Sequence, residues 1–457
     1  MRKPGEILLL STYELGHAPQ GVALPAAHLE AAGYLPAALD LSVELLDAER
    51  VRRARLVAIS VPMHTALRLG LAAAARVRAL APDAVLCFHG LYAPLNADLL
   101  VGAGAAAVLG AEVGAQLVAL AGAVERGEDL ARFVQRGPGA TPPHPEPPVV
   151  PSRALLPPPE RYARLDAGDG TCRVAGYVEA TRGCKHRCRH CPVVPLYQGR
   201  FFAVPEEAVL ADVAAQVGAG VEHVTFGDPD FLNGPTHALR VARALHARFP
   251  AVTFDFTAKI EHLLRLPAAV AELARLGAAF ATTAVESLSD RVLAALAKGH
   301  TRADALRVFA RCREAGLPLR PSLLPFTPWS TLEDYLDLLD VLEAQGLLPA
   351  LDPVQLSIRL LVPPGSLLEG DPSIAFDPLD PAVLTWRWRH PDPRMDRLQA
   401  RVAAEVEAAA TAHEEPLATI ARVKVLALAE AGLSHGHVRT LAPDQRRVPR
   451  LTESWFC

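Results

Sequence analysis

Three cysteines fall within eight positions of the chain, directly after an apolar run. The segment reads Gly183-Cys184-Lys-His-Arg-Cys188-Arg-His-Cys191, with the spacing C-x3-C-x2-C. The apolar run at 174–180 predicts a strand, which places the cysteines in the loop at its carboxyl end. Only seven cysteines occur in 457 residues, so this clustering indicates a metal site in a reducing compartment rather than a disulfide framework.

Three thiolates are one fewer than the four ligands that saturate a cubane iron–sulfur cluster. One iron then keeps an open position for an exogenous ligand, as the metal does in a catalytic zinc site. We therefore predict that Cys184, Cys188 and Cys191 hold a 4Fe–4S cluster. A structural zinc site is the alternative, and it requires a fourth ligand such as His186 or His190.

The chain around this loop alternates short apolar runs with helical segments from about residue 160 to 360. The predicted strands lie at 174–180, 221–227, 252–258, 279–285, 317–324 and 354–360. Six successive β/α units favour a parallel sheet curled into a partial (β/α)6 barrel, with functional groups at the carboxyl ends of its strands.

The first part of the chain shows a similar alternation, with apolar runs at 7–10, 56–61, 85–88 and 106–109. This spacing predicts a doubly wound, Rossmann-like α/β domain. Residues 137–159 contain 10 prolines in 23 positions and predict an extended, semi-rigid spacer. The predicted divisions are an α/β domain at 1–130, a linker at 131–160, a barrel at 161–362 and a C-terminal extension at 363–457, with one or two helices between about 393 and 432.

Composition excludes several classes of function. With 51% hydrophobic and 21% charged residues, the chain is expected to be globular and well buried. A formal net charge of −4 gives no general reason to bind nucleic acid or an anionic membrane. The apolar run at 7–10 is too short for a signal peptide or a membrane span. We expect a soluble, cytoplasmic protein with neither nucleic acid nor membrane as partner.

The cysteine loop resembles that of the radical S-adenosylmethionine (SAM) superfamily, and the resemblance covers about 170–360. It implies that SAM binds at the open iron and is reductively cleaved to a carbon radical, with electrons from a flavodoxin or a ferredoxin-type protein. The radical would abstract hydrogen from a substrate at the barrel mouth. No motif identifies that substrate as a small molecule or a peptide.

The same resemblance suggests contacts to SAM. Asp228 and Asp230, at the end of the second barrel strand, fall where the superfamily carries a Gly-Gly-Glu-like segment that holds the SAM amino group; an Asx-Pro turn is the structural alternative. Glu286 and Ser287 follow the fourth strand, where related enzymes contact the ribose or the methionyl end of SAM. Two basic residues are further candidate contacts to SAM or the substrate, with a salt bridge as the alternative: Lys259 and Arg320.

The N-terminal domain resembles the cobalamin-binding domain of one radical SAM class. The lower-ligand motif D-x-H-x-x-G is absent, because His17 lacks the Asp two residues before it and Gly21 is displaced by one position. Either cobalamin binds without a histidine ligand or the pocket is vacant. A cobalamin-dependent methyltransferase is therefore the alternative activity. A non-catalytic iron–sulfur redox or sensor protein and a zinc-stabilised binding module are alternatives of other classes.

The tail Leu-Thr-Glu-Ser-Trp-Phe-Cys457, together with the cysteine loop, resembles the radical SAM proteins that end in a CUAEP or CCAEP tail. In those proteins a cysteine is followed by selenocysteine or cysteine and then Ala-Glu-Pro. The hypothesis that follows is a native chain that continues as a selenoprotein. Cys457 would then be catalytic, as hydrogen donor, redox relay or substrate ligand.

Overall fold

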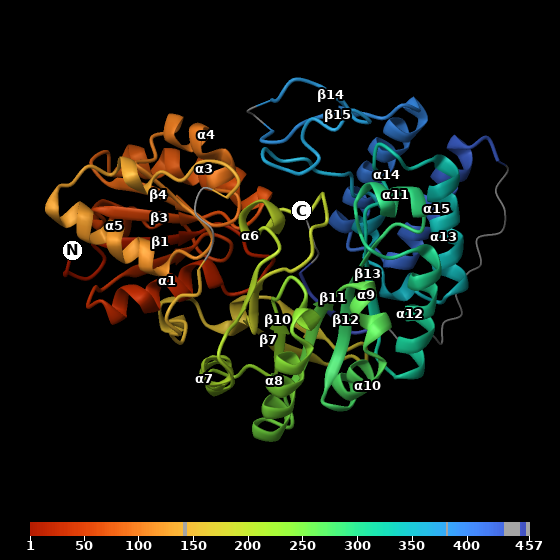
Figure 1. Cartoon of the computed structure of the whole chain (residues 1–457), viewed down its shortest axis with the longest axis horizontal. Coiled ribbons are helices and arrows are strands. Elements are labelled where there is room, and N and C mark those ends of the chain that lie inside the picture. The colour runs from red at the N-terminus through yellow and green to blue at the C-terminus, as the bar shows by residue number, and fades with distance from the viewer. Residues whose placement is uncertain (140–143, 381–382, 434–447, 454–457) are drawn as a thin grey trace.

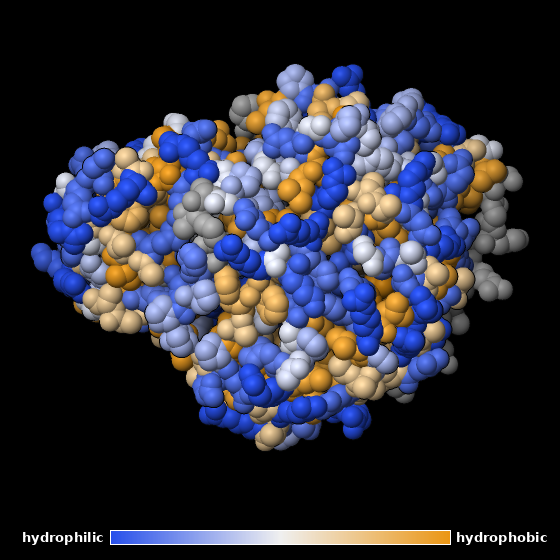
Figure 2. Space-filling view, viewed as in Figure 1, coloured by the Kyte–Doolittle hydropathy of each residue, from blue (hydrophilic) through white to orange (hydrophobic). Residues whose placement is uncertain are grey.

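The structure is a computed structural model that describes every residue except 140–143, 381–382, 434–447 and 454–457. Two α/β bodies lie side by side, with the N-terminal domain separate from a larger body formed by the barrel and the C-terminal helices (Figure 1). Among the described residues, no helix has the length and apolar character needed to cross a membrane. On the face shown in Figure 2, hydrophobic residues are interspersed with hydrophilic ones.

The N-terminal domain contains a five-stranded parallel sheet in the order β2-β1-β3-β4-β5. This order belongs to the flavodoxin-like, doubly wound arrangement, in which ligands bind beyond the carboxyl ends of β1 and β3. The elements are β1 (Ile7–Ser11), α1 (Gln20–Ala31), β2 (Ala37–Asp40), α2 (Ala48–Arg53), β3 (Leu56–Ser60), α3 (His64–Leu80), β4 (Val85–His89), α4 (Ala97–Gly102), β5 (Ala107–Leu109) and α5 (Gly114–Arg126).

Burial and side-chain type together explain which strands of this sheet could be predicted from the sequence. Every residue of β1 and β3 is buried, as expected for central parallel strands that read as continuous apolar runs. Strand β2 was not predicted. It has only four residues, two of them alanine, and it ends at Asp40, so it carries little of the β-branched or aromatic character of a typical strand.

The proline-rich segment crosses from one domain to the other. Its described part includes a short 3-10 turn, Arg153–Leu155, from which the Arg153 side chain reaches both domains. The guanidinium pairs with Asp212 of the barrel at 2.6 and 2.8 Å. It also donates to the Tyr177 carbonyl at 2.7 Å and to the side chain of Gln20, on α1, at 2.9 Å. Because Arg153 and Asp212 are both largely buried, this segment fastens the two domains together.

The second sheet has the order β13-β12-β11-β10-β7-β6-β16, with β7 and β10 to β13 parallel. This confirms the predicted α/β fold class with a partial barrel. The strands are β6 (Arg164–Asp166), β7 (Cys172–Val178), β8 (Thr181–Gly183), β9 (Phe201–Ala203), β10 (His223–Phe226), β11 (Thr253–Ala258), β12 (Ala278–Glu286) and β13 (Leu319–Leu323). The helices are α6 (Val193–Tyr197), α7 (Glu206–Gly218), α8 (Pro235–Arg248), α9 (Ile260–Arg265), α10 (Pro267–Arg275), α11 (Asp290–Ala295), α12 (Arg302–Glu314) and α13 (Leu332–Ala344).

The sixth predicted strand, 354–360, was wrong. Residues Pro353–Leu356 form a 3-10 turn, and only a single parallel bridge joins Phe326 to Arg359. Proline at the start of the segment has a fixed φ that suits the first position of a helical turn, and it has no N–H to donate to a neighbouring strand.

The C-terminal region packs against the barrel through two helices, α14 (Pro393–Thr411) and α15 (Pro416–Glu430), which confirms the helices predicted there. A small hairpin, β14 (Ala375–Phe376) and β15 (Trp388–Arg389), precedes them. Strand β16 (Arg450–Leu451) pairs antiparallel with β6, which is itself antiparallel to β7. The chain at β16 therefore runs in the direction of β7, toward the carboxyl ends of the barrel strands.

Candidate active site

The cysteine loop begins directly after the short hairpin arm β8. Gly183, the residue before Cys184, has a φ of 76°, and a Cβ there would lie 2.5 Å from the Arg200 carbonyl oxygen. Only glycine suits such a position, so Gly183 allows the chain to turn into the loop. Cys184 and Cys188 are buried and Cys191 is partly buried, and all three are free thiols.

The three thiols are close enough to affect one another. Burial raises the pKa of Cys191 to about 12, and the neighbouring sulfurs of Cys188 and Cys184 add to the increase. Burial also raises the pKa of Cys184. Burial and mutual repulsion thus disfavour the thiolate forms of Cys184 and Cys191, and coordination to a metal, which deprotonates a thiol outright, would remove this penalty. This donor set fits an iron–sulfur cluster with three protein ligands.

A buried charge cluster lies beside the cysteines. Glu286 ends β12 with a φ of 61°, at a point where the register with β13 shifts. Its Oε1 atom lies 3.0 Å from Lys298 Nζ and 3.5 Å from His190 Nε2. Burial opposes ionisation of Glu286, but Lys298 and His190 outweigh it and hold the pKa of Glu286 well below its ordinary range. Non-glycine residues with positive φ concentrate at functional sites, and this one adjoins the cluster ligands.

The ammonium of Lys298 interacts with the Glu286 carboxylate and with the cysteine sulfurs. Burial disfavours its charge, yet Glu286 and the Cys188 sulfur together raise the pKa of Lys298. Lys298 was not predicted from the sequence. Ser287, a predicted SAM contact, accepts a hydrogen bond from the Ser289 backbone N–H at 3.1 Å, which is a local structural contact.

The two aspartates after β10 have different environments. Asp228 accepts hydrogen bonds from the Ala180 backbone N–H at 3.0 Å and from the Thr181 hydroxyl at 2.5 Å, so both of its oxygens support the turn before the cysteine loop. Burial raises the pKa of Asp228 to about 7. Asp230 caps the following turn through one oxygen, at 3.2 Å from the Leu232 N–H. Its other oxygen faces His262 and is free of structural bonds, so Asp230 is the better candidate to bind a ligand.

The two basic candidates, Lys259 and Arg320, also lie in different environments. Lys259 is buried at the start of α9, and its Nζ lies 3.9 Å from Glu261. Arg320 lies on β13 opposite Thr282, well before the strand's end, and pairs with Asp352 at 2.6 Å. The structure therefore favours the ion-pair alternative for Arg320 over a contact to SAM, because its position lies below the barrel mouth and its charge is already neutralised.

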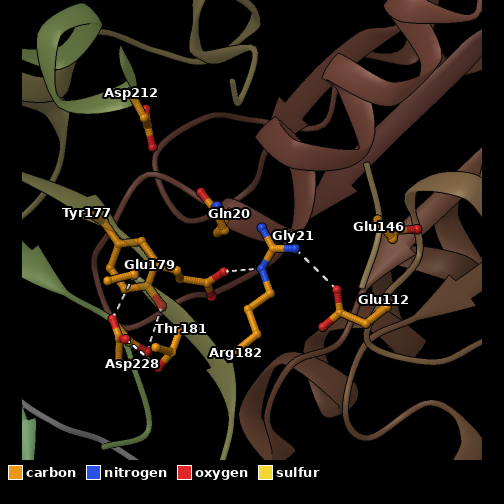
Figure 3. Close-up of polar contacts among 12 residues, drawn as sticks. Gln20, Gly21, Glu112, Glu146, Tyr177, Glu179, Thr181, Arg182, Asp212 and Asp228 are labelled. Atoms are coloured by element: carbon orange, nitrogen blue, oxygen red, sulfur yellow. Dashed lines mark hydrogen bonds and ion pairs between the residues drawn. The ribbon is translucent and has the colours of Figure 1, made fainter. Parts of the chain in front are cut away.

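Between the two domains lies a cleft of about 260 Å³. Its walls come from the carboxyl ends of strands in both sheets and from the cysteine loop. Arg182, just before that loop, lies between Glu179 of the barrel and Glu112 of the N-terminal domain (Figure 3). The ion pairs measure 2.8 and 3.2 Å. Residues of the cleft include Glu14, Ser60, His89, Glu112, Tyr177, Glu179, Arg182, Tyr197 and Gly227.

Lys298 and His262 were not predicted as members of the site. The position of Arg182, two residues before the first cysteine, indicated positive charge beside the cluster but not its ion pair with Glu112 of the N-terminal domain. Lys298 follows α11 and His262 lies on α9, each after a different barrel strand, and only the curl of the sheet brings them to the cysteines. Cys457 lies outside the described residues, so its catalytic role stays a prediction.

Residues 178–339 match the family model described as Radical SAM superfamily, and this part of the chain is therefore a radical SAM domain. The chain thus contains a radical SAM domain, which supports a radical SAM enzyme, and the cofactors of such a domain are a 4Fe–4S cluster and SAM. The match begins at the end of β7 and includes the cysteine loop and the positions of Asp230, Glu286 and Lys298.

Solved structures of two radical SAM enzymes with cobalamin bound share the fold. The radical SAM methyltransferase TsrM from Kitasatospora setae, with cobalamin and a [4Fe–4S] cluster bound, superposes with a TM-score of 0.58 at 17% identity, covering 74% of this chain and 73% of TsrM. The cobalamin-dependent radical enzyme OxsB, with aqua-cobalamin bound, gives 0.64 at 14% identity, covering 86% of this chain and 66% of OxsB. Both resemblances extend across most of the chain, which agrees with the two-domain architecture.

Proposed function

We propose that the enzyme acts on a small molecule or peptide segment held in the cleft between the two domains. The position of this cleft is the observation that carries the proposal. Arg182 and Gly183, just before the first cysteine, line it, and so do Val193 and Tyr197, just after the third. The carboxyl ends of both parallel sheets face it, where ligands bind in open α/β sheets and barrels. When bound, the cluster and SAM supply the radical chemistry.

The chain's own residues supply binding and exclusion of water. Two polar atoms beside the cysteines are buried without a hydrogen-bond partner, Nδ2 of Asn233 and Nδ1 of His190. Buried polar groups are normally paired, so unpaired ones beside a cofactor site support the binding of a polar ligand there. Tyr197 and Val193, both buried, cover the cysteine loop on the side of the cleft. Electrons would come from a flavodoxin or ferredoxin-type protein.

The first experiment measures whether the protein cleaves SAM. Protein reconstituted anaerobically with iron and sulfide should bind SAM and, given a reductant, release 5′-deoxyadenosine. Formation should require both the reductant and the cluster. A cluster whose spectrum ignores added SAM and yields no 5′-deoxyadenosine would favour a non-catalytic redox or sensor protein. Candidate substrates are then ranked by how far each accelerates 5′-deoxyadenosine release.

Cobalamin-assisted methyl transfer is a second candidate, which His89 favours. His89 ends β4 in the cleft, is 1% exposed, and its Nε2 has no hydrogen-bond partner. Burial lowers the pKa of His89 to about 4, which leaves the imidazole neutral and suited to ligate a metal. At about 260 Å³ the cleft falls just below the common range of ligand pockets, about 300–1,000 Å³, so a corrin requires the domains to move apart.

Cobalamin binding gives a separate expected result. If this second candidate holds, protein incubated with hydroxocobalamin and desalted should retain close to one equivalent by absorbance. The His89→Ala variant should then alter the spectrum of bound cobalamin, since a nitrogen ligand would be lost. His64→Ala is the matched control, because His64 Nε2 contacts the Val383 carbonyl at 2.8 Å. Retention of no cobalamin, with 5′-deoxyadenosine still formed, would leave hydrogen abstraction as the activity.

A further inference from the structure

A second group of metal-ligating side chains lies next to the cysteine loop. His186 belongs to the loop, Asp230 follows β10, and His262 lies on α9 after β11. One ligand atom from each residue lies within 4.8 Å of the other two. Asp230 Oδ2 is 2.7 Å from His262 Nδ1 and 3.6 Å from His186 Nε2. Three separate elements of the barrel thus bring two imidazoles and one carboxylate to a single point.

These three atoms lack other partners. His186 Nε2, Asp230 Oδ2 and His262 Nδ1 are each buried without a hydrogen bond. The pair at 2.7 Å is within hydrogen-bonding distance but is not oriented for a hydrogen bond. Side-chain exposure is 14% for His186, 0% for Asp230 and 5% for His262. Since buried polar atoms are rarely left unpaired, convergence of three such atoms indicates a missing cation.

We propose that His186, Asp230 and His262 bind a single divalent transition-metal ion, separate from the iron–sulfur cluster. Ligand atoms of a tetrahedral zinc site, each about 2 Å from the ion, lie about 3.3 Å apart, and the two distances to Asp230 bracket this spacing. Two histidines and one carboxylate also ligate non-haem iron, with positions left open for an exogenous ligand. In this site the ion would coordinate Oδ2 of Asp230, the oxygen that makes no hydrogen bond.

Charged groups of both signs surround the three ligand atoms. Glu261 contributes a second carboxylate, whose Oε2 lies 3.8 Å from His186 Nδ1. Its charge is offset by Arg265, 2.7 Å from Oε1, and in part by Lys259, 3.9 Å from Oε2. The carboxylate of Asp230 therefore supplies the negative charge that faces the ion. Asn233 links this group to the cluster loop, because its Oδ1 accepts from the Lys185 N–H at 3.4 Å and lies 3.8 Å from Cys184 Sγ.

Zinc binding tests the proposal on the protein with its cluster in place. After reconstitution, treatment with a chelator and incubation with Zn²⁺, desalted protein should contain one zinc per chain in addition to the cluster iron. Asp230→Asn and His262→Ala should weaken zinc binding at least tenfold. Asparagine can still cap the turn after position 230, so loss of zinc from that variant is not a folding effect. His246→Ala is the matched control, because this histidine lies on the last turn of α8, away from the barrel mouth.

A second measurement separates this site from adventitious binding to the cysteines. The variant with Cys184, Cys188 and Cys191 all replaced by alanine, shown to be folded by circular dichroism, should bind one Co²⁺. Its spectrum should show d–d bands without thiolate-to-metal charge transfer. Equal zinc contents in the His262→Ala and His246→Ala proteins would overturn the proposal, as would no zinc above background. Neither measurement depends on SAM cleavage, so failure of the proposed function would leave this result unaffected.

Discussion

Replacing Cys188 with alanine is expected to abolish the 4Fe–4S cluster and, with it, 5′-deoxyadenosine formation. Cys188 is buried beside two other cysteines in the same loop. With two thiolates left, the site falls further below the four ligands that complete a cubane cluster. Iron and sulfide per chain after anaerobic reconstitution should fall to background, and 5′-deoxyadenosine release should fall by at least three orders of magnitude.

Cys172→Ala is the control for this substitution. Cys172 is a free thiol on β7, but it is exposed and stands at the opposite end of that strand from the cysteine loop. Its replacement should leave both the cluster content and the reaction unchanged. A Cys188→Ala protein that still forms a cluster able to cleave SAM would disprove the ligand assignment.

Replacing Lys298 with methionine should produce the largest loss of stability. Lys298 has a side-chain exposure of 3% and is the closest cation to the buried Glu286. Removal of one partner of a buried ion pair leaves an unpaired buried charge, which typically costs about 3–5 kcal/mol. The free energy of unfolding, measured by denaturant titration, should fall by about that amount. Lys3→Met is the control, because Lys3 is exposed and lies in the other domain.

The pH dependence of stability gives the prediction for Lys298 a second readout. In the native protein the pKa of Glu286 is lowered from its ordinary value of 4.5. This residue therefore adds stability above about pH 4.5, which is lost as the pH falls through the lower folded-state pKa. The Lys298→Met protein should lose this contribution, while adding Glu286→Gln should restore most of the stability at neutral pH. No recovery in the double variant would contradict the ion-pair explanation.

The cysteine loop shows what the sequence could predict. The spacing of its cysteines predicted the cofactor, and the strand before the loop predicted the position of the loop at the barrel mouth. Both signals are local in the sequence. Asp228 and Asp230 were found in the same way, but the sequence could not separate their roles. That difference depends on Thr181 and Ala180, which occupy the oxygens of Asp228. Such contacts span more than 40 residues and follow from the pairing of strands, which no local pattern contains.

Lys298 shows what lay beyond sequence reasoning. It follows α11 in a segment that reads as an ordinary helix end, where a basic residue is expected for its effect on the helix dipole. Only the curl of the sheet and the register shift at Glu286 turn it toward the cysteines. The sixth strand failed for a related reason. Residues 354–360 alternate apolar and polar side chains as a strand does, but Pro353 begins a 3-10 turn that includes the first three of them.

The contacts of Arg153 have a consequence for how often the cleft opens. The residue holds Asp212 of the barrel and Gln20 of the N-terminal domain at the same time. If Arg153 stays paired with Asp212, separation of the domains would break its hydrogen bond to Gln20, which is worth about 1.5–3 kcal/mol because the donor is charged. At about 1.4 kcal/mol for each tenfold change, this contact alone would reduce the open form to roughly one molecule in ten to one in a hundred. A large cofactor or substrate would enter through that rare form, so its rate of binding would saturate at the rate of opening rather than rise with concentration.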